Sequence, residues 1–168
     1  MTHPLVLGLF DTPADAATAA RALRALGLPR ERVSIVARNH DEEGELATAT
    51  GGSPGSEIED SRIASRLAEL GAHLIAAIAV VLPGIGPIVA DGPLAAGLGE
   101  AAGHLAGGLR RTLEDAGVTA ADAEQWEAQI ERGAVLIAAH VAEATVGAAR
   151  TALETAGASK VTEGTWHE

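Results

Sequence analysis

The chain has 168 residues, a formal net charge of −11 and no cysteine. The acidity argues against a nucleic-acid partner and against docking on anionic lipid, because both need clustered Lys and Arg. The lack of cysteine excludes a disulfide framework and thiol chemistry within these residues. No basic region precedes an apolar run at the N-terminus, so we expect no signal peptide and a cytoplasmic location.

The first 38 residues predict a strand, a helix and a second strand. Leu5–Phe10 is a short apolar run typical of a buried strand. Thr12 can cap the helix that follows, which carries small and apolar residues at helical spacing and ends at Gly27. Arg32–Arg38 alternates apolar and polar residues and predicts the second strand. Residues 1–38 therefore form the first half of a small α/β unit.

The middle of the chain is predicted to be a linker followed by a helical hairpin. Residues 39–56 are polar and rich in Gly and Ser, which is typical of a mobile linker. Residues 57–82 predict a helix that is polar at first and wholly apolar at its end. The sequence PGIGPIVADGP predicts a turn, and a second helix is expected over 94–116. The segment 57–116 is thus predicted to be an inserted, Ala- and Gly-rich antiparallel helical hairpin.

The C-terminal segment, residues 117–168, repeats the pattern of the N-terminus. Thr119 can cap a short acidic helix, and Ala134–Val141 predicts a strand. A helix ending at Gly157 and a last strand over Ser159–Trp166 complete a second strand–helix–strand half. Two such halves predict an α+β fold of the ferredoxin-like type, in which four antiparallel strands are backed by two helices. The hairpin interrupts this fold.

Small residues recur every four positions along both predicted arms of the hairpin. Residues four apart share a helix face, so each arm has a ridge with almost no side chain, as in a glycine zipper. Such ridges favour close packing of helices, either within one chain or between chains. We expect the second case, self-association into a dimer or a larger homo-oligomer. The residues of the ridges are Ala64, Ala68, Ala72, Ala76, Ala95, Gly99, Gly103 and Gly107.

Membrane association is an alternative use of the hairpin. The apolar run Leu74–Ala90 reaches only the lower limit of a spanning helix, about 17 residues. The second arm also carries polar side chains that are costly in lipid. These features favour a soluble oligomer, and the alternative is a peripheral contact through the hairpin tip. The residues of the tip are Pro83, Ile85, Pro87, Ile88 and Val89.

Two histidines in the predicted hairpin suggest a metal or haem site as a further alternative. If the arms fold back about residues 88–89, His73 and His104 lie at the same height. Each follows a glutamate by four positions, Glu69 and Glu100 respectively. Facing Glu and His side chains can bind a transition metal, and two histidines can hold a haem iron. The spacing differs from the Glu-x-x-His of di-iron bundles and also fits a simple surface contact, so we expect no resident cofactor.

No catalytic motif accompanies these features. The sequence contains no nucleophile elbow and no metalloprotease helix motif, and it has no cysteine for a Cys–His pair. His140 falls on a predicted strand, where a packed or edge residue is more common than a catalytic base. The sequence therefore predicts a protein that is not an enzyme.

The chain resembles the bacterial general stress protein family typified by the heat-induced YflT-like domain, together with related hydrophobic, Gly-rich proteins of unknown function. The resemblance lies in the first strand–helix–strand unit, in the turn PGIGP followed by GPLAAGL, and in AEQWEAQIERGAVLIAAHV. It covers most of the chain outside the linker. It implies a stress-associated protein without an established enzymatic activity. We therefore expect a non-enzymatic structural or interaction protein that assembles through its hairpin.

Overall fold

The computed structural model describes residues 1–38, 66–67, 69, 78–82, 86–101 and 108–167. The strands are Thr2–Phe10 (β1), Val33–Arg38 (β2), Ile78–Leu82 (β3), Gly86–Asp91 (β4), Val135–His140 (β5) and Lys160–His167 (β6). The α-helices with described bounds are Pro13–Ala25 (α1), Pro93–Ala101 (α5), Gly108–Asp115 (α6), Ala120–Glu131 (α7) and Val146–Thr155 (α8). Short 3-10 helices span Arg30–Arg32 (η1) and Glu143–Thr145 (η2).

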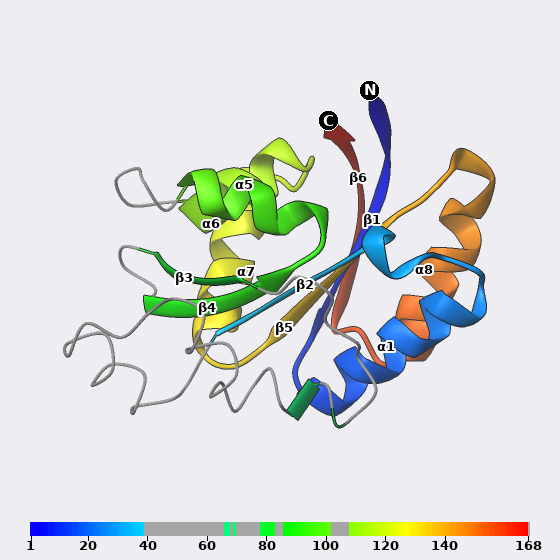
Figure 1. Ribbon diagram of the computed structural model, residues 1–168, viewed down its shortest axis with the longest axis horizontal. Helices are drawn as coiled ribbons and strands as arrows, with labels where there is room; N and C mark the ends of the chain where they lie inside the picture. The colour runs from blue at the N-terminus through cyan, green and yellow to red at the C-terminus, as the bar shows by residue number, and fades with distance from the viewer. Residues whose placement is uncertain (39–65, 68, 70–77, 83–85, 102–107, 168) are drawn as a thin grey trace.

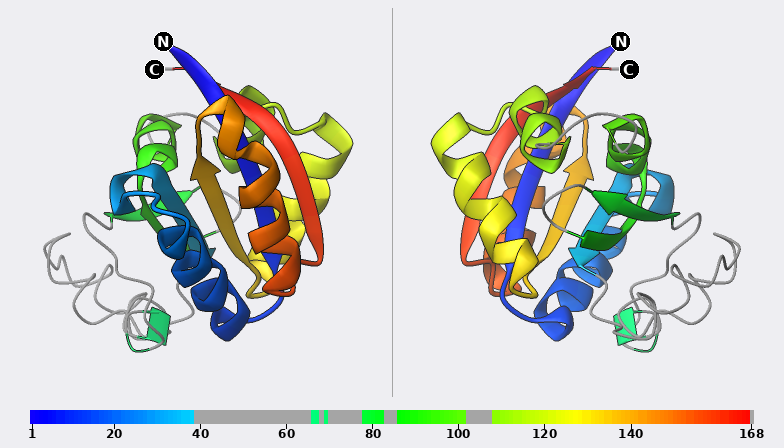
Figure 2. Two further views of the ribbon diagram at one scale, coloured as in Figure 1. Left: turned by 90° about the vertical axis from the view of Figure 1, so that its right-hand side faces the viewer. Right: turned by 90° about the vertical axis from the view of Figure 1, so that its left-hand side faces the viewer.

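The described strands form one six-stranded antiparallel sheet between two layers of helices. The strand order is β3-β4-β2-β5-β1-β6. Helices α1 and α8 cover one face, and α5, α6 and α7 cover the other (Figures 1 and 2). The α+β class expected from the sequence is therefore confirmed.

The two strand–helix–strand segments fold as their local signals predicted. The helix caps are in place: Thr12 Oγ1 accepts a hydrogen bond from the Asp15 backbone N–H, and Thr119 Oγ1 accepts one from Asp122, both at 3.2 Å. The four strands of these segments are neighbours in the order β2-β5-β1-β6. Strands β1 and β5 lie in the centre, where both of their faces are buried.

The predicted helical hairpin is wrong over residues 78–91. Instead of a helix end and a turn, these residues form strands β3 and β4, which pair with each other, and β4 also pairs with β2. Apolar runs of this length occur in buried helices and in buried strands alike. Here the β-branched residues Ile78, Val80, Val81, Ile88 and Val89 favour the strand.

The second predicted arm is present as helix, but not as one described helix. It contains α5 and α6, which pack against each other, and residues 102–107 lie outside the described part of the chain. Most of the first arm, over 57–77, also lies outside it. Ile88 and Val89, about which the arms were expected to fold back, are instead paired residues of β4.

Side chains alternate between two hydrophobic layers along the sheet. On β1, Leu5, Leu7 and Leu9 pack under α5, α6 and α7, whereas Val6 and Phe10 pack under α1 and α8. All five are fully buried. The alternation fixes which polar side chains of the neighbouring strands reach each layer.

The outer edge of β6 is covered by the connection between α6 and α7. The backbone N–H of Thr165 donates to Ala116 O at 3.2 Å. A Cβ at Gly164 would overlap that same oxygen, so only glycine permits this approach. The side chain of Lys160 also pairs with Asp122 on α7. The other end of the sheet is β3, whose only described neighbour strand is β4.

Gly92 makes the sharp turn from β4 into α5. Its φ is +83°, and a Cβ there would overlap Val33 O and lie 2.7 Å from Ser34 Cα on β2. Gly27, at the end of α1, has a similar φ of +89°, but a Cβ there would have no other atom within 4 Å. An added side chain would therefore meet only backbone strain at Gly27, but both backbone strain and a steric overlap at Gly92.

We expect Gly92→Ala to destabilise the protein much more than Gly27→Ala. The left-handed backbone costs a Cβ about 1–2 kcal/mol at either position. At Gly92 the overlap with β2 should raise the loss to the order of 3 kcal/mol or more. Urea denaturation of both variants measures the difference. Equal losses in the free energy of unfolding would show that the turn does not press against β2.

Candidate functional site

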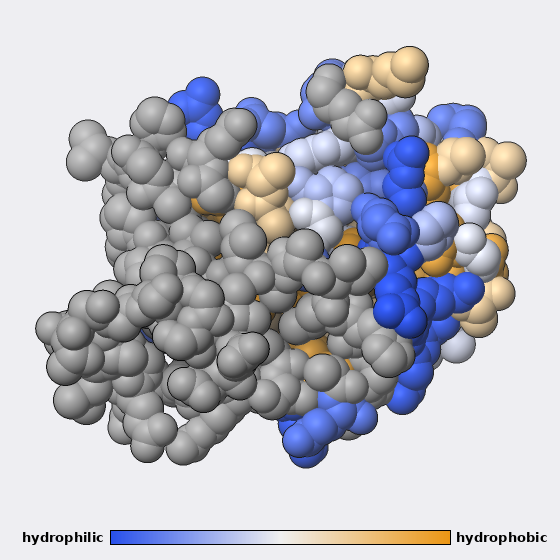
Figure 3. All heavy atoms as spheres, viewed as in Figure 1, coloured by the Kyte–Doolittle hydropathy of each residue, from blue (hydrophilic) through white to orange (hydrophobic). Residues whose placement is uncertain are grey.

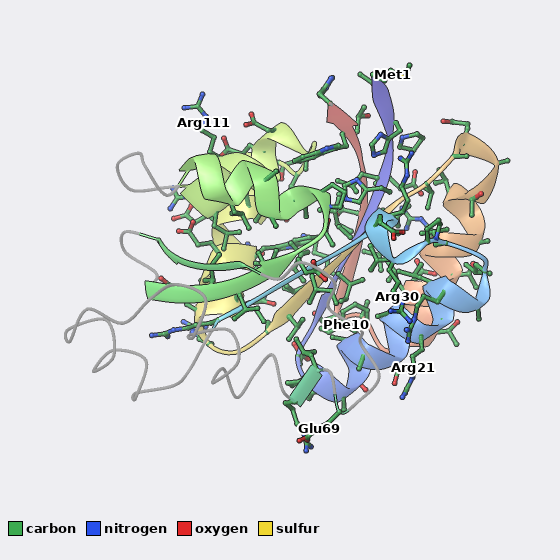
Figure 4. All side chains as sticks on the ribbon, viewed as in Figure 1. Met1, Phe10, Arg21, Arg30, Glu69 and Arg111 are labelled. Carbon is green, nitrogen blue, oxygen red and sulfur yellow. The ribbon has the colours of Figure 1, made fainter. Side chains whose placement is uncertain are left out.

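A row of hydrogen-bonded polar side chains crosses the sheet beneath the start of α5, and two of them, Ser34 and His140, are buried. Ser34 Oγ on β2 lies 2.9 Å from His140 Nε2 on β5. His140 Nδ1 lies 3.0 Å from His3 Nε2 on β1. At the other end, Ser34 Oγ accepts a hydrogen bond of 3.0 Å from the backbone N–H of Leu94. His3 is the second residue of β1, and the labelled Met1 in Figure 4 marks where that strand begins.

The direction of the hydrogen bonds follows from the need to satisfy buried protons. We assign the Ser34 hydroxyl as donor to His140 Nε2, and His140 Nδ1–H as donor to His3 Nε2. With the opposite tautomer, Ser34 Oγ would accept from both Leu94 and His140. Its own proton would then have no acceptor among the described residues. His140 thus acts as acceptor and donor at once.

His140 is held in its neutral form. Its residue is 2% exposed, and its ring makes edge contacts with Trp166 at 5.7 Å and with His3 at 5.2 Å between centroids. Burial lowers the pKa of His140 from 6.5 to about 3, and the nearby charges of His3 and Arg32 act in the same direction. A neutral imidazole is what the assigned hydrogen bonds require.

The order serine, histidine, histidine resembles the nucleophile, base and orienting group of acyl-transfer sites. Two observations argue against that use. A histidine whose pKa is about 3 is a weak base at neutral pH. Ser34 is fully buried, and the turn at Gly92 lies directly against it. The arrangement fits a structural link in which Ser34 caps the first turn of α5 from a neighbouring strand.

A surface cavity of about 350 Å³ lies where β1 and β6 meet the start of α8. Glu143, Glu163, Thr2 and Thr165 give it a polar lining, and His3 contributes to its wall. Glu163 Oε1 is engaged by Arg150 Nε at 2.7 Å. Within the described residues, no group of three or more His, Asp or Glu side chains is placed to hold a metal ion.

The metal or haem hypothesis falls mostly outside the described residues. His73 and His104 both lie there. Glu69 is exposed, and Glu100 belongs to α5. The hypothesis stays a prediction.

The predicted small-residue ridges are also only partly described. Six of their residues lie outside the described part: Ala64, Ala68, Ala72, Ala76, Gly103 and Gly107. Ala95 and Gly99 are in α5. Ala95 is 6% exposed and packs within the layer under α5, α6 and α7, so its small side chain serves a contact inside the chain.

The predicted membrane tip is wrong at Ile88 and Val89. Pro83 and Ile85 lie outside the described residues, and Pro87, Ile88 and Val89 are part of β4. Ile88 and Val89 are buried, because β4 is an inner strand of the sheet. They are not available as a lipid-facing tip. No helix in the described part of the chain combines the length and the apolar character needed to cross a bilayer.

Sequence reasoning anticipated a packed role for His140 but missed both of its partners. His140 is buried on β5, as its position on a predicted strand indicated. Ser34 carried one signal, because it is the polar residue between two apolar residues of a short strand. Nothing in the sequence links it to His3, since the link depends on strand order and register.

Comparison with known proteins gives no match to this chain: no family model, no curated protein and no solved structure is significantly similar to it. Function is therefore inferred from the residues and their geometry.

We expect His140 to make stability fall on acidification. Its pKa is about 3 in the folded state and near 6.5 when unfolded, so the unfolded chain binds more protons between these values. The free energy of unfolding should fall by up to about 1.4 kcal/mol per pH unit from this group as the pH drops below 6.5. Urea denaturation from pH 7.5 to 4.5 should show a shallower dependence for His140→Asn. Parallel curves for both proteins would contradict the assignment.

Proposed function

We propose that the chain is a non-enzymatic interaction protein that associates with a second copy of itself through strand β3. The observation that carries this proposal is the difference between the two edges of the sheet. One edge is covered by the chain's own backbone, and the other ends in a short apolar strand. No resident cofactor is part of the proposal.

We assign the four strands β2, β5, β1 and β6, with helices α1 and α8, to a ferredoxin-like arrangement. Their order and their antiparallel pairing support this assignment. Strands β3 and β4 then extend that sheet beyond β2. The extension moves the sheet edge from β2 to β3.

The edge at β6 is poorly suited to a partner strand. Ala116 O already accepts the N–H of Thr165, and Gly164 has no room for a side chain against it. Charged residues on β6, among them Lys160 and Glu163, also oppose pairing with another strand. An added strand would have to displace the connection between α6 and α7.

The edge at β3 has the opposite character. Its sequence, IAVVL, contains no charged residue and no proline, which are two of the usual protections of an edge strand. Within the described residues, backbone groups on its outer side have no strand partner. Pairing with a second β3 about a twofold axis would satisfy such groups in both copies.

The remaining described surface offers weaker candidates for a buried contact. On the side viewed in Figure 3, the region around α1 and η1 is strongly hydrophilic. Among the described large hydrophobic side chains, only Met1 and Leu26 are exposed, and they stand at separate places in the fold. Single exposed apolar residues are normal on a monomer and do not indicate an interface.

The association with stress rests on the sequence resemblance alone. It would fit a protein whose assembly, rather than a chemical reaction, performs its role. The small α/β domain would lie outside the joined strands, accessible to other partners.

We expect a lysine in β3 to dissociate the assembly. Successive residues point to opposite faces of a strand, so Ala79→Lys and Val80→Lys together test both faces. Size exclusion with light scattering should give a dimer or larger species for the native chain. At least one variant should be folded by circular dichroism and monomeric, because a charge at the edge opposes pairing.

The matched control is Thr162→Lys on β6, which should keep the native mass. A native chain that is monomeric would overturn the proposal. So would two folded β3 variants that both retain the native mass.

A further inference from the structure

Helix α5 is attached to the sheet where β4 separates from β2. The last β2–β4 pair is Ile35 with Asp91, and Ser34 lies one residue beyond it. At this point the chain turns at Gly92. The Leu94 N–H donates a hydrogen bond to the side chain of Ser34 instead of to the backbone of a neighbouring strand. The start of α5 is thus held to β2 by a side-chain hydrogen bond, whereas β4 is held to β2 by the backbone hydrogen bonds of the sheet.

This hydrogen bond depends on two residues from the next two strands of the sheet, His140 on β5 and His3 on β1. Ser34 can accept from Leu94 and donate at the same time only because His140 Nε2 accepts its proton. His140 can accept there only because its other nitrogen donates to His3. His3 is only partly buried, so the chain of hydrogen bonds connects the solvent-accessible start of β1 with the first turn of α5.

A proton on His140 is incompatible with this arrangement. An imidazolium has two donors and no acceptor, so the Ser34 hydroxyl would lose its acceptor. The described charged groups around His140 do not compensate for its charge. His3 on β1 and Arg32 on η1 are both basic groups that disfavour it.

Among the described residues of the other elements packed around this site, no carboxylate is hydrogen-bonded to the ring, whose two nitrogens contact His3 and Ser34. At the end of β4, Asp91 Oδ1 accepts the N–H of Gly92 at 2.9 Å. From β6, Trp166 presents a neutral ring, and His167 follows it on the opposite face of the strand. From α5, the group that reaches Ser34 is the backbone N–H of Leu94.

We infer that the Ser34–His140–His3 chain is an acid-sensitive latch, which releases the first turn of α5 from β2 when His140 takes up a proton. The sheet should stay paired during this release. Strands β1 and β5 are held by ladders on both sides, whereas the Leu94 amide is held by the single hydroxyl of Ser34. The latch does not depend on association through β3.

Hydrogen exchange at single backbone amides tests the latch. We compare the Leu94 amide with those of Leu7 on β1 and Ile137 on β5 at pH 7.5 and 4.5, after correction for intrinsic exchange rates. Protection at Leu94 should fall by about tenfold or more at the lower pH, while protection at Leu7 and Ile137 changes much less.

Two variants and one control separate the latch from general acid instability. Ser34→Ala removes the acceptor of the Leu94 N–H, so protection at Leu94 should be low at both pH values. His140→Asn removes the buried titrating group and should remove most of the pH dependence. The control is Thr112→Ala in α6, which removes a buried hydroxyl bonded to Gly108 O outside the chain of hydrogen bonds and should keep the native response.

The latch is refuted if protection at Leu94 in the native protein does not change with pH. It is also refuted if Leu94, Leu7 and Ile137 lose protection in parallel, because the whole domain would then be opening. If His140→Asn does not fold, a pH response at Leu94 in Ser34→Ala equal to that of the native protein contradicts the latch by itself.

Discussion

The pairing of β4 with β2 determines how the middle of the chain folds. Strand β2 is apolar on both faces, with Val36 under α5–α7 and Ile35 under α1. Without β4, this apolar strand would lie at the edge of the sheet, and the backbone groups on its outer side would be unpaired. The register with β4 satisfies these groups from Ile35 to Arg38 and so brings the apolar middle segment into the sheet.

The consequences of this pairing run in two directions. Toward α5, the chain must turn at Gly92 directly against β2, and the helix begins where Ser34 can bind its first turn. Toward β3, the pairing of β3 with β4 places an apolar strand at the end of the sheet. The hydrogen bonds that join Leu94, Ser34 and His140 and the proposed contact between copies thus both follow from the pairing of β4 with β2. Each can be tested without the other.

The sequence predicted the features that depend on local signals. Thr12 and Thr119 cap the helices that their positions indicated, and the strand–helix–strand segments at both ends are present. The helical hairpin failed over 78–91 because a short apolar run does not distinguish a buried helix from a buried strand. Pairing with the edge of β2 favours the strand, and β2 lies about 50 residues away in the sequence. His3 and His140 are 137 positions apart, so their contact follows only from the pairing of β1 with β5.

The most direct test of association through β3 uses the absence of cysteine from the chain. A single cysteine replaces Val80, at the centre of β3, or Thr162 on β6, and each protein is treated with a short bismaleimide. In an antiparallel pair about a twofold axis, central residues of the two strands come within about 5 Å of each other. Association through β3 predicts a cross-linked dimer for Val80→Cys and none for Thr162→Cys. A dimer that forms through Thr162→Cys alone, or equally through both, would contradict it.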